Sequence, residues 1–321
     1  MNKKDLEPAV KLGDKVLESF FVFSPFIYDF PLPKGKDIEL YDLKFFSPLV
    51  GASFKSEIKI MEMWIRMGLG GAIHKTIMSQ KRDGNPSPRL QDAIYDGQKG
   101  IINSLGLPGQ GVDEFADNIS TSNLWTFDRP LGISIGGESL NEYLDNVKKI
   151  DKGFKNIEKQ YFYELNISCP NTENGITICQ EPENLESLLV NLRKVIDEVI
   201  SIKVSPDVAD EKLLQIGEIA SFFEKIIINA GNTKFVKPMD VYVDPNNFSM
   251  EGGGLSGLPV FKRTLEMIEL FSNFKNPIMA TGGISTISHV NAAKSTGASL
   301  FGMATSLVLN PYCIPKINSQ L

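Results

Sequence analysis

Short apolar runs alternate with longer amphipathic stretches from about residue 45 to the end of the chain. The longer stretches, such as 183–198 and 210–225, carry apolar residues at helical spacing. The runs have the length of strands and span residues 45–53, 70–76, 130–137, 161–168, 199–206, 225–231, 277–283 and 299–306. Eight strands separated by helices predict a parallel α/β fold that closes as a TIM (β/α)8 barrel. An open doubly wound sheet is the alternative, but no GxGxxG motif follows the first run.

The N-terminal residues follow a different pattern. Residues 5–22 have apolar side chains at helical spacing, which predicts an amphipathic helix, and residues 21–36 form a connector rich in Phe and Pro. We therefore divide the chain into an N-terminal helical extension, residues 1–40, and a barrel, residues 41–321. Packing on the barrel explains the extension most simply; contact with a partner, a quinone or a membrane is the alternative.

Composition narrows the possible classes of protein. A net charge of −6 over 321 residues argues against nucleic-acid binding, because proteins that grip phosphate backbones usually carry a basic surplus. The three cysteines form no CxxC pair and the two histidines lie far apart, so we expect no metal site. The charged start of the chain lacks the apolar core of a secretion signal, and no apolar run reaches the roughly 18 residues of a membrane span. We expect a cytoplasmic protein.

Loops of small residues follow the last strands of the predicted barrel. Residues 281–286 and 302–306 each connect a strand to a helix, and residues 252–257 are rich in glycine. Glycines let a backbone approach an anion closely, and helix N-termini present free N–H groups. Because the loops after strands seven and eight commonly bind phosphate in this fold, we predict a phosphate site there. Ordinary turns are the alternative.

The segment ELNISCPN, residues 164–171, has the densest polar chemistry in the chain. Asn166, Cys169 and Asn171 lie together at a strand end, where a TIM barrel carries its active site. Asparagine amides both donate and accept hydrogen bonds, which suits a planar ligand with carbonyl and N–H groups. An isolated cysteine is usually a small buried apolar residue. Its polar neighbours favour a catalytic role for Cys169, whereas Cys179 and Cys313 are interpreted as packing residues.

Further polar residues follow other strands on the same predicted face. They are Lys75, Asn103, Lys203, Asn232 and Thr233. The lysines provide positive charge for an anionic ligand. No pair of carboxylates occurs among these strand ends, which disfavours glycoside hydrolysis.

Taken in order, these motifs resemble the dihydroorotate dehydrogenases. The similarity extends over about residues 40–312 and rests on GNPSPR (84–89), INSLGLP (102–108), ELNISCPN (164–171), IKVSP (202–206), NAGNT (229–233), GGGLSG (252–257) and TGGI (281–284). The resemblance implies an FMN flavoprotein that oxidises dihydroorotate to orotate in de novo pyrimidine (UMP) biosynthesis. Hydride would pass from C6 to flavin N5 while a base removes the proton at C5.

The resemblance also implies roles for individual residues. Cys169 matches the base of the class 1 enzymes, and Lys75 matches a lysine near both flavin and substrate. Asn103, Asn166, Asn171, Asn232 and Thr233 match residues around orotate, and the backbone of Leu105, Gly106 and Leu107 matches the loop at its carboxylate. The matches for FMN are Ser53, Lys75, Thr76, Asn166, Lys203, Gly257, Gly282, Gly283, Ala304 and Thr305. Because a free thiol titrates near pH ~8.5, we expect a mildly alkaline pH optimum.

The sequence departs from the class 1 pattern at two points. The first departure is the N-terminal helical extension, which is a trait of the quinone-linked class 2 enzymes. The sequence therefore leaves the electron acceptor open among fumarate, NAD, quinone and oxygen. The second departure is Ala304, which stands where the family usually has glycine. The resemblance to class 1 enzymes also suggests that the protein forms a homodimer. A related FMN-dependent dihydropyrimidine dehydrogenase and a non-catalytic barrel that binds a phosphate ligand are the alternative functions.

Overall fold

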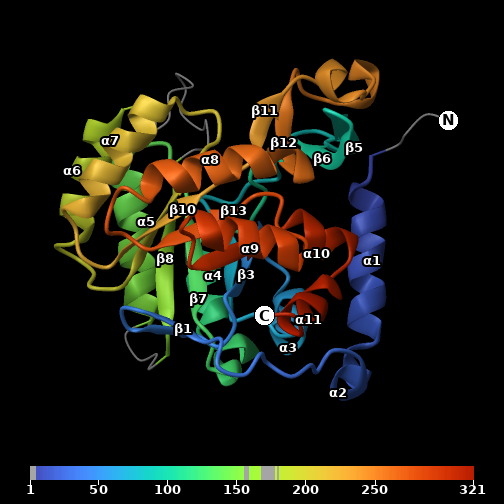
Figure 1. Cartoon of the computed structure of the whole chain (residues 1–321), viewed down its shortest axis with the longest axis horizontal. Coiled ribbons are helices and arrows are strands. Elements are labelled where there is room, and N and C mark those ends of the chain that lie inside the picture. The colour runs from blue at the N-terminus through green and yellow to red at the C-terminus, as the bar shows by residue number, and fades with distance from the viewer. Residues whose placement is uncertain (1–4, 155–158, 168–177, 179–180) are drawn as a thin grey trace.

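A closed barrel of eight parallel strands forms the centre of the molecule. The structure is a computed structural model and describes residues 5–154, 159–167, 178 and 181–321 (Figure 1). The strands follow the order β10-β13-β14-β3-β4-β7-β8-β9 around the barrel. Their bounds are β3 (Leu49–Lys55), β4 (Gly71–Ile77), β7 (Leu131–Ile135), β8 (Tyr161–Asn166), β9 (Ile200–Val204), β10 (Ile226–Ala230), β13 (Ile278–Thr281) and β14 (Leu300–Met303). Each predicted run contains or overlaps one of these strands, so the predicted TIM barrel is confirmed.

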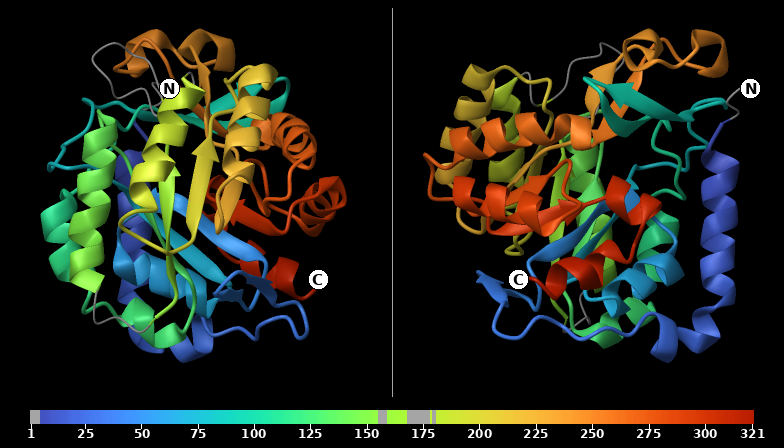
Figure 2. Two further views of the ribbon diagram at one scale, coloured as in Figure 1. Left: turned by 90° about the vertical axis from the view of Figure 1, so that its left-hand side faces the viewer. Right: turned by 45° about the vertical axis from the view of Figure 1, so that its right-hand side comes forward.

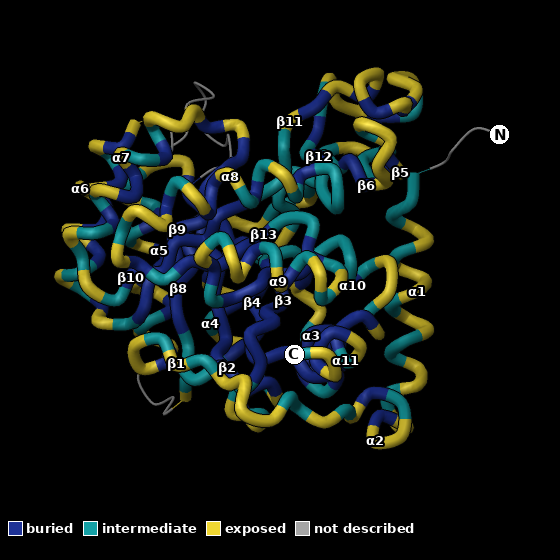
Figure 3. Tube along the Cα trace, in the orientation of Figure 1, coloured by how far each residue is buried: buried dark blue, intermediate teal, exposed yellow. Residues whose placement is uncertain are grey.

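Helices cover the outside of the barrel (Figures 1 and 2). They are α3 (Ile58–Arg66), α4 (Val112–Ile119), α5 (Leu140–Phe154), α6 (Pro182–Leu192), α7 (Asp210–Ser221), α8 (Phe261–Phe271), α9 (Ile287–Thr296), α10 (Thr305–Leu309) and α11 (Cys313–Asn318); the 3-10 turn η2 (Asn123–Phe127) follows α4. Apolar side chains of these helices pack on the outward residues of the strands, as Leu185 and Leu189 of α6 do. The core therefore lies between barrel and helices, where the tube of Figure 3 is buried.

The barrel interior is apolar at one end and polar at the other. Phe162 of β8 lies in a buried cluster with Ile73, Ile227 and Met279 from three other strands. Because successive side chains of a strand alternate between faces, Glu164 shares the inward face of β8 with Phe162. Glu164 is also buried, but its neighbours are polar. The apolar layer closes the N-terminal end of the barrel and leaves the polar layer toward the strand C-termini.

A small antiparallel sheet lies across the C-terminal end of the barrel. Its order is β11-β12-β6-β5, and its strands are β5 (Leu90–Tyr95), β6 (Gln98–Asn103), β11 (Lys234–Val236) and β12 (Gly253–Gly257). The turns η4 (Pro238–Val241) and η5 (Pro245–Asn247) lie between β11 and β12, and η6 (Leu258–Val260) follows β12. The hairpin β5–β6 follows β4, whereas β11 follows β10 on the opposite side of the barrel. This sheet was not among the predicted elements, and the segment 252–257, expected as a loop, forms a strand because it pairs with β6.

The chain before the barrel forms α1 (Glu7–Ser19), η1 (Phe21–Phe23), α2 (Ser24–Ile27) and the hairpin β1 (Ile38–Leu40) with β2 (Leu43–Phe45). The amphipathic helix predicted in residues 5–22 is present as α1, which runs along one side of the molecule (Figure 2). The hairpin closes the N-terminal end of the barrel, since Leu43 and Phe45 belong to the interior apolar cluster. Within the described residues, no helix is long and apolar enough to cross a membrane.

Candidate active site

A pocket of about 960 Å³ opens at the C-terminal ends of the barrel strands. Its size falls within the range of small-molecule and cofactor sites. Every predicted site residue that the structure describes lines this pocket: Ser53, Lys75, Thr76, Asn103, Leu105, Gly106, Leu107, Asn166, Lys203, Asn232, Thr233, Gly257, Gly282, Gly283, Ala304 and Thr305. Cys169 and Asn171 lie outside the described residues, as does Cys179. The structure thus brings together residues from distant parts of the sequence.

A chain of hydrogen bonds crosses the floor of the pocket. The Asn166 amide donates to Thr76 Oγ1 over 3.0 Å, and Thr76 Oγ1 lies 3.0 Å from Ser134 Oγ. The amide of Asn232 donates to Asn166 Oδ1 over 3.3 Å, and the N–H of Thr233 donates to Asn232 Oδ1 over 2.9 Å. These contacts fix the amide planes, which lets the two asparagines hold a planar ligand in one orientation.

A buried carboxylate lies directly below this floor. Glu164 is fully buried and accepts hydrogen bonds from Ser53 Oγ over 2.6 Å and from Asn229 Nδ2 over 2.7 Å. Its oxygen is 3.9 Å from Lys203 Nζ, which itself donates to Ser53 Oγ over 2.9 Å. Glu164 therefore holds the ammonium of Lys203 in place and balances its charge.

We expect replacement of Glu164 with alanine to destabilise the apoprotein strongly. The change leaves Lys203 buried without its counter-charge, and breaking a buried pair on one side typically costs about 3–5 kcal/mol. The free energy of unfolding, measured in denaturant without flavin, checks this value. The double variant Glu164→Leu/Lys203→Met removes both charges and should recover much of the loss. Equal stability of Glu164→Ala and the unchanged protein would contradict the role of the pair.

The pKa of Lys75 is shifted toward neutral pH. Burial is the main cause that lowers its pKa from 10.5 to about 8, while the carboxylate of Glu57 opposes the shift. The neighbouring His74 is buried and packs against Phe115, with the ring centroids 4.7 Å apart and the rings tilted by 54°. Burial lowers the pKa of His74 to about 4, so it is neutral and serves packing. Lys75 is thus the titratable group of β4 that faces the pocket.

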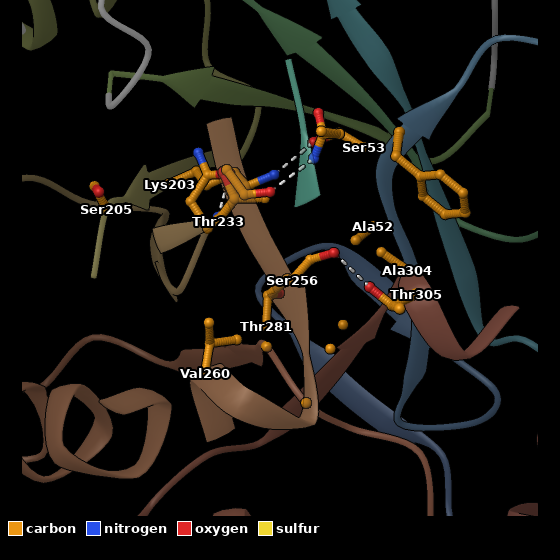
Figure 4. A pocket seen from close by; sticks show the side chains of 18 of the residues that line it. Ala52, Ser53, Lys203, Ser205, Thr233, Ser256, Val260, Thr281, Ala304 and Thr305 are labelled. Atoms are coloured by element: carbon orange, nitrogen blue, oxygen red, sulfur yellow. Dashed lines mark hydrogen bonds between the residues drawn. The ribbon is translucent and has the colours of Figure 1, made fainter. Parts of the chain in front are cut away.

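The small-residue loops meet at one side of the pocket. Gly282 and Gly283 have φ angles of 140° and 77°, and added Cβ atoms would lie 2.4 Å from Thr264 Oγ1 and 2.5 Å from Phe261 Cβ. Only glycine fits there. Thr305 Oγ1 donates to Ser256 Oγ over 2.9 Å, which joins the end of β12 to the start of α10 (Figure 4). Ala304, at the position where the resemblance leads one to expect glycine, has a φ of −134°, outside the left-handed region that favours glycine.

The charges of the pocket suit an anionic ligand. Among the described lining residues, four are lysines (Lys75, Lys99, Lys203 and Lys212) and one is an acid, Asp207. This cationic excess stands out in a chain of net charge −6. The hydroxyl of Thr281, at the end of β13, is buried without a hydrogen-bond partner in the described part of the chain. A phosphate-bearing, polar cofactor fits these donors.

Several residues of the site were missed by sequence reasoning. Glu164 is a charged residue inside an otherwise apolar strand run, and that contrast was the available signal. Lys99 lines the pocket only because the antiparallel sheet brings β6 there, next to Ser256 of the predicted segment 252–257. Cys313 is buried at the start of α11, as expected of a packing residue. The described residues contain no cluster of three or more potential metal ligands.

A closed (β/α)8 barrel with a cation-rich pocket at its C-terminal face defines an enzyme architecture. The family model described as "Dihydroorotate dehydrogenase" matches residues 37–321, which is most of the chain. The chain therefore belongs to the dihydroorotate dehydrogenase family, a family of oxidoreductases of pyrimidine biosynthesis.

Curated relatives and solved structures agree with this assignment. A protein of Bacillus cereus (strain G9842) named "Dihydroorotate dehydrogenase B (NAD(+)), catalytic subunit" is 30% identical over 295 residues, which is 88% of this chain and 90% of the relative. A protein of Pyrococcus abyssi with the same name is 28% identical over 282 residues, 87% of this chain and 89% of the relative. The crystal structure of DHODH in complex with ferulenol from Eimeria tenella has a TM-score of 0.79 at 19% identity, covering 96% of this chain and 89% of that one. This last likeness concerns the fold.

Proposed function

We propose that the protein oxidises dihydroorotate to orotate with FMN as its bound cofactor and Cys169 as the base. The observation that carries the proposal is that every described residue that the family resemblance assigns to flavin or substrate lines the same pocket. Its excess of lysines suits the FMN phosphate and the orotate carboxylate together. The names of the relatives support the same substrate.

The residues of the pocket divide into two groups in this proposal. Gly257, Gly282, Gly283, Ala304 and Thr305 hold the phosphate, where free N–H groups at the start of α10 and the glycine turn stabilise negative charge. Ser53, Lys75, Thr76, Asn166 and Lys203 hold the ring system. When bound, FMN supplies the hydride acceptor for C6 of dihydroorotate.

The substrate side of the pocket orients the pyrimidine and removes one proton. Asn103, Asn166, Asn171, Asn232 and Thr233 bind the carbonyl and N–H groups of the ring, and the backbone of residues 105–107 binds the carboxylate. Lys75 adds a positive charge. Cys169 Sγ takes the proton from C5. Cys313, the cysteine within the described residues, is unsuited to this task because burial raises its pKa to about 11.

The reductive half-reaction tests the proposal without an electron acceptor. We expect the purified protein to be yellow, and dihydroorotate should bleach its flavin absorbance under anaerobic conditions. Dihydrouracil, which lacks the carboxylate, serves as the matched control and should bleach it far more slowly. Faster bleaching by dihydrouracil would favour a dihydropyrimidine dehydrogenase. A colourless protein that fails to bind added FMN would favour a non-catalytic barrel.

For the electron acceptor we propose NAD. The supporting observation is that the relatives are named as catalytic subunits of NAD(+) enzymes. Such a name describes one subunit of a larger enzyme, so the proposal includes a second subunit that carries electrons between flavin and NAD. Reoxidation of the reduced protein by NAD, fumarate, a soluble quinone and oxygen, each with and without proteins co-purified from the native cell, ranks the acceptors. Rapid reoxidation of the isolated chain by quinone would contradict the NAD proposal.

A further inference from the structure

On the face of α1 that turns toward the barrel, two acids, Glu7 and Asp14, form ion pairs with barrel residues. Glu7, Val10, Asp14 and Leu17 are partly covered and follow the spacing of one helix face. Leu12 and Val16, in contrast, are 63% and 48% exposed. A helix held by apolar packing alone would turn Leu12 and Val16 inward. The orientation of α1 therefore depends on what its two carboxylates contact.

Glu7 forms a two-point ion pair with Arg89 at the start of β5. Its carboxylate accepts from Arg89 Nε over 2.6 Å and from Nη2 over 2.9 Å, and both side chains are almost covered. The hydrogen bond from Arg89 is the main cause that lowers the pKa of Glu7 to about 2. Asp5 accepts from the N–H groups of Arg89 and Leu90, and the N–H of Leu6 donates to the Leu90 carbonyl over 2.9 Å. The start of α1 is thus docked on this point of the barrel mouth.

Arg89 connects this ion pair to the wall of the pocket. Its Nη1 donates to the carbonyl of Asn85 over 2.8 Å and to the carbonyl of Leu105 over 3.4 Å. Asn85 itself donates from its backbone N–H to the Leu105 carbonyl over 3.0 Å and from its amide to the Ser104 carbonyl over 2.9 Å. Residues 104–107 line the pocket. The conformation of this segment therefore depends on Arg89.

The segment needs such support because its turn is unusual. Gly106 and Leu107 have φ angles of 71° and 52°, and the left-handed region is unfavourable for a leucine.

A second ion pair fixes the other half of α1: Asp14 contacts Lys55 at the end of β3, and both side chains are largely covered. Figures 1 and 2 show α1 spanning the side of the molecule between these regions.

We propose that Glu7 is a positioning residue for substrate binding: it holds Arg89, and Arg89 holds residues 104–107 in the turn that receives the substrate carboxylate. The proposal rests on the proposed function, in which the backbone of this segment binds the carboxylate. It gives α1 a task in the active site although no residue of α1 lines the pocket.

The test uses the full-length, flavin-loaded protein and the variant Glu7→Gln. We expect KM for dihydroorotate to rise roughly 10-fold, equivalent to ~1.4 kcal/mol, with kcat and flavin content nearly unchanged. Hydrogen exchange at the amides of residues 104–107 should become faster. Arg89→Lys keeps the charge but loses the planar fork, so it should act in the same way. The double variant should be no worse than either single one, since both break the same connection. Glu18→Gln, on the same helix, is the matched control and should leave both readouts unchanged.

Three results would overturn the proposal. Unchanged exchange at residues 104–107 in Glu7→Gln would show that α1 does not brace the segment. Faster exchange with an unchanged KM would show that the brace does not serve substrate binding. A parallel fall in flavin content, kcat and unfolding midpoint would indicate a general structural role. If the unmodified protein does not oxidise dihydroorotate at all, the proposed function fails by itself, and the exchange measurement still decides whether Glu7 positions the segment.

Discussion

Replacement of Cys169 with alanine is expected to slow flavin reduction by dihydroorotate roughly 10²–10⁴-fold, because a positioned general base contributes about that much to a proton transfer. Flavin binding should be nearly normal, since the thiol is assigned to the substrate side of the cofactor. Anaerobic stopped-flow bleaching of the flavin measures the rate directly. In the unmodified protein the rate should rise as the pH increases toward the thiol pKa, ~8.5 for a free cysteine, and this rise should disappear in the variant.

Cys313→Ala is the matched control for this experiment. Cys313, the first residue of α11, is buried and lies 3.9 Å from the Ser306 carbonyl of α10; burial raises its pKa to about 11, so it is a neutral thiol at the working pH. We expect that variant to lose some stability and to retain the rate of flavin reduction. A near-normal rate in Cys169→Ala would remove the cysteine from the mechanism, whatever the control shows.

Lys75→Ala should weaken the binding of both FMN and orotate by roughly 30-fold, or about 2 kcal/mol each, because truncating one member of a buried charged contact commonly costs at least that much. Orotate affinity in the unmodified protein should also depend on pH. The pKa of Lys75 is lowered to about 8, so the ammonium is present below that pH and is lost as the pH rises through it. Orotate remains an anion over this range. Affinity should therefore fall more steeply above pH 8 in the unmodified protein than in the variant.

Titration of flavin absorbance with orotate between pH 6.5 and ~9.5 covers this transition on both sides of the Lys75 pKa. Lys81→Ala makes the same change of charge at an exposed residue of the following loop, and we expect it to leave both affinities unaltered. If Lys75→Ala binds flavin and orotate normally, β4 does not supply the cation of the site, and the charge must come from Lys99, Lys203 or Lys212.

The barrel could be predicted because its strands are buried on both faces. A strand such as β10 is apolar along almost its whole length, and the single Asn229 does not hide the pattern. The polar residues that follow each strand then indicate one common face, so the sequence alone predicts Lys203 and Asn232 beside Asn166. Such predictions need only the period of the elements and the direction of parallel strands.

The antiparallel sheet could not be found in the same way. β11 has only three residues and β12 is glycine-rich, so neither can be recognised as a strand from the sequence. β12 becomes a strand through pairing with β6, more than a hundred residues earlier in the chain, and β11 becomes one through pairing with β12. The hairpin β5–β6 did carry a signal: Asp96 and Gly97 both have positive φ, and an Asp-Gly pair between alternating apolar residues is a strong hairpin indicator. The ion pair of Glu7 with Arg89 and the hydrogen bonds of Glu164, in contrast, join residues that are distant in sequence, so no local pattern indicates them.

The antiparallel sheet also constrains how sequences of this fold can vary. Its backbone hydrogen bonds join the hairpin β5–β6, which follows β4, to β11 and β12, which follow β10, although β4 and β10 stand on opposite sides of the barrel. A residue inserted in β6 or β12 would shift the register on both sides at once. The exposed hairpin tip at Asp96 and Gly97 and the exposed residues 244–246 between β11 and β12 lie outside the ladder, so length changes should be tolerated there. Homologues should accordingly differ in length at those tips, whereas each paired strand should keep the same number of residues from one homologue to the next.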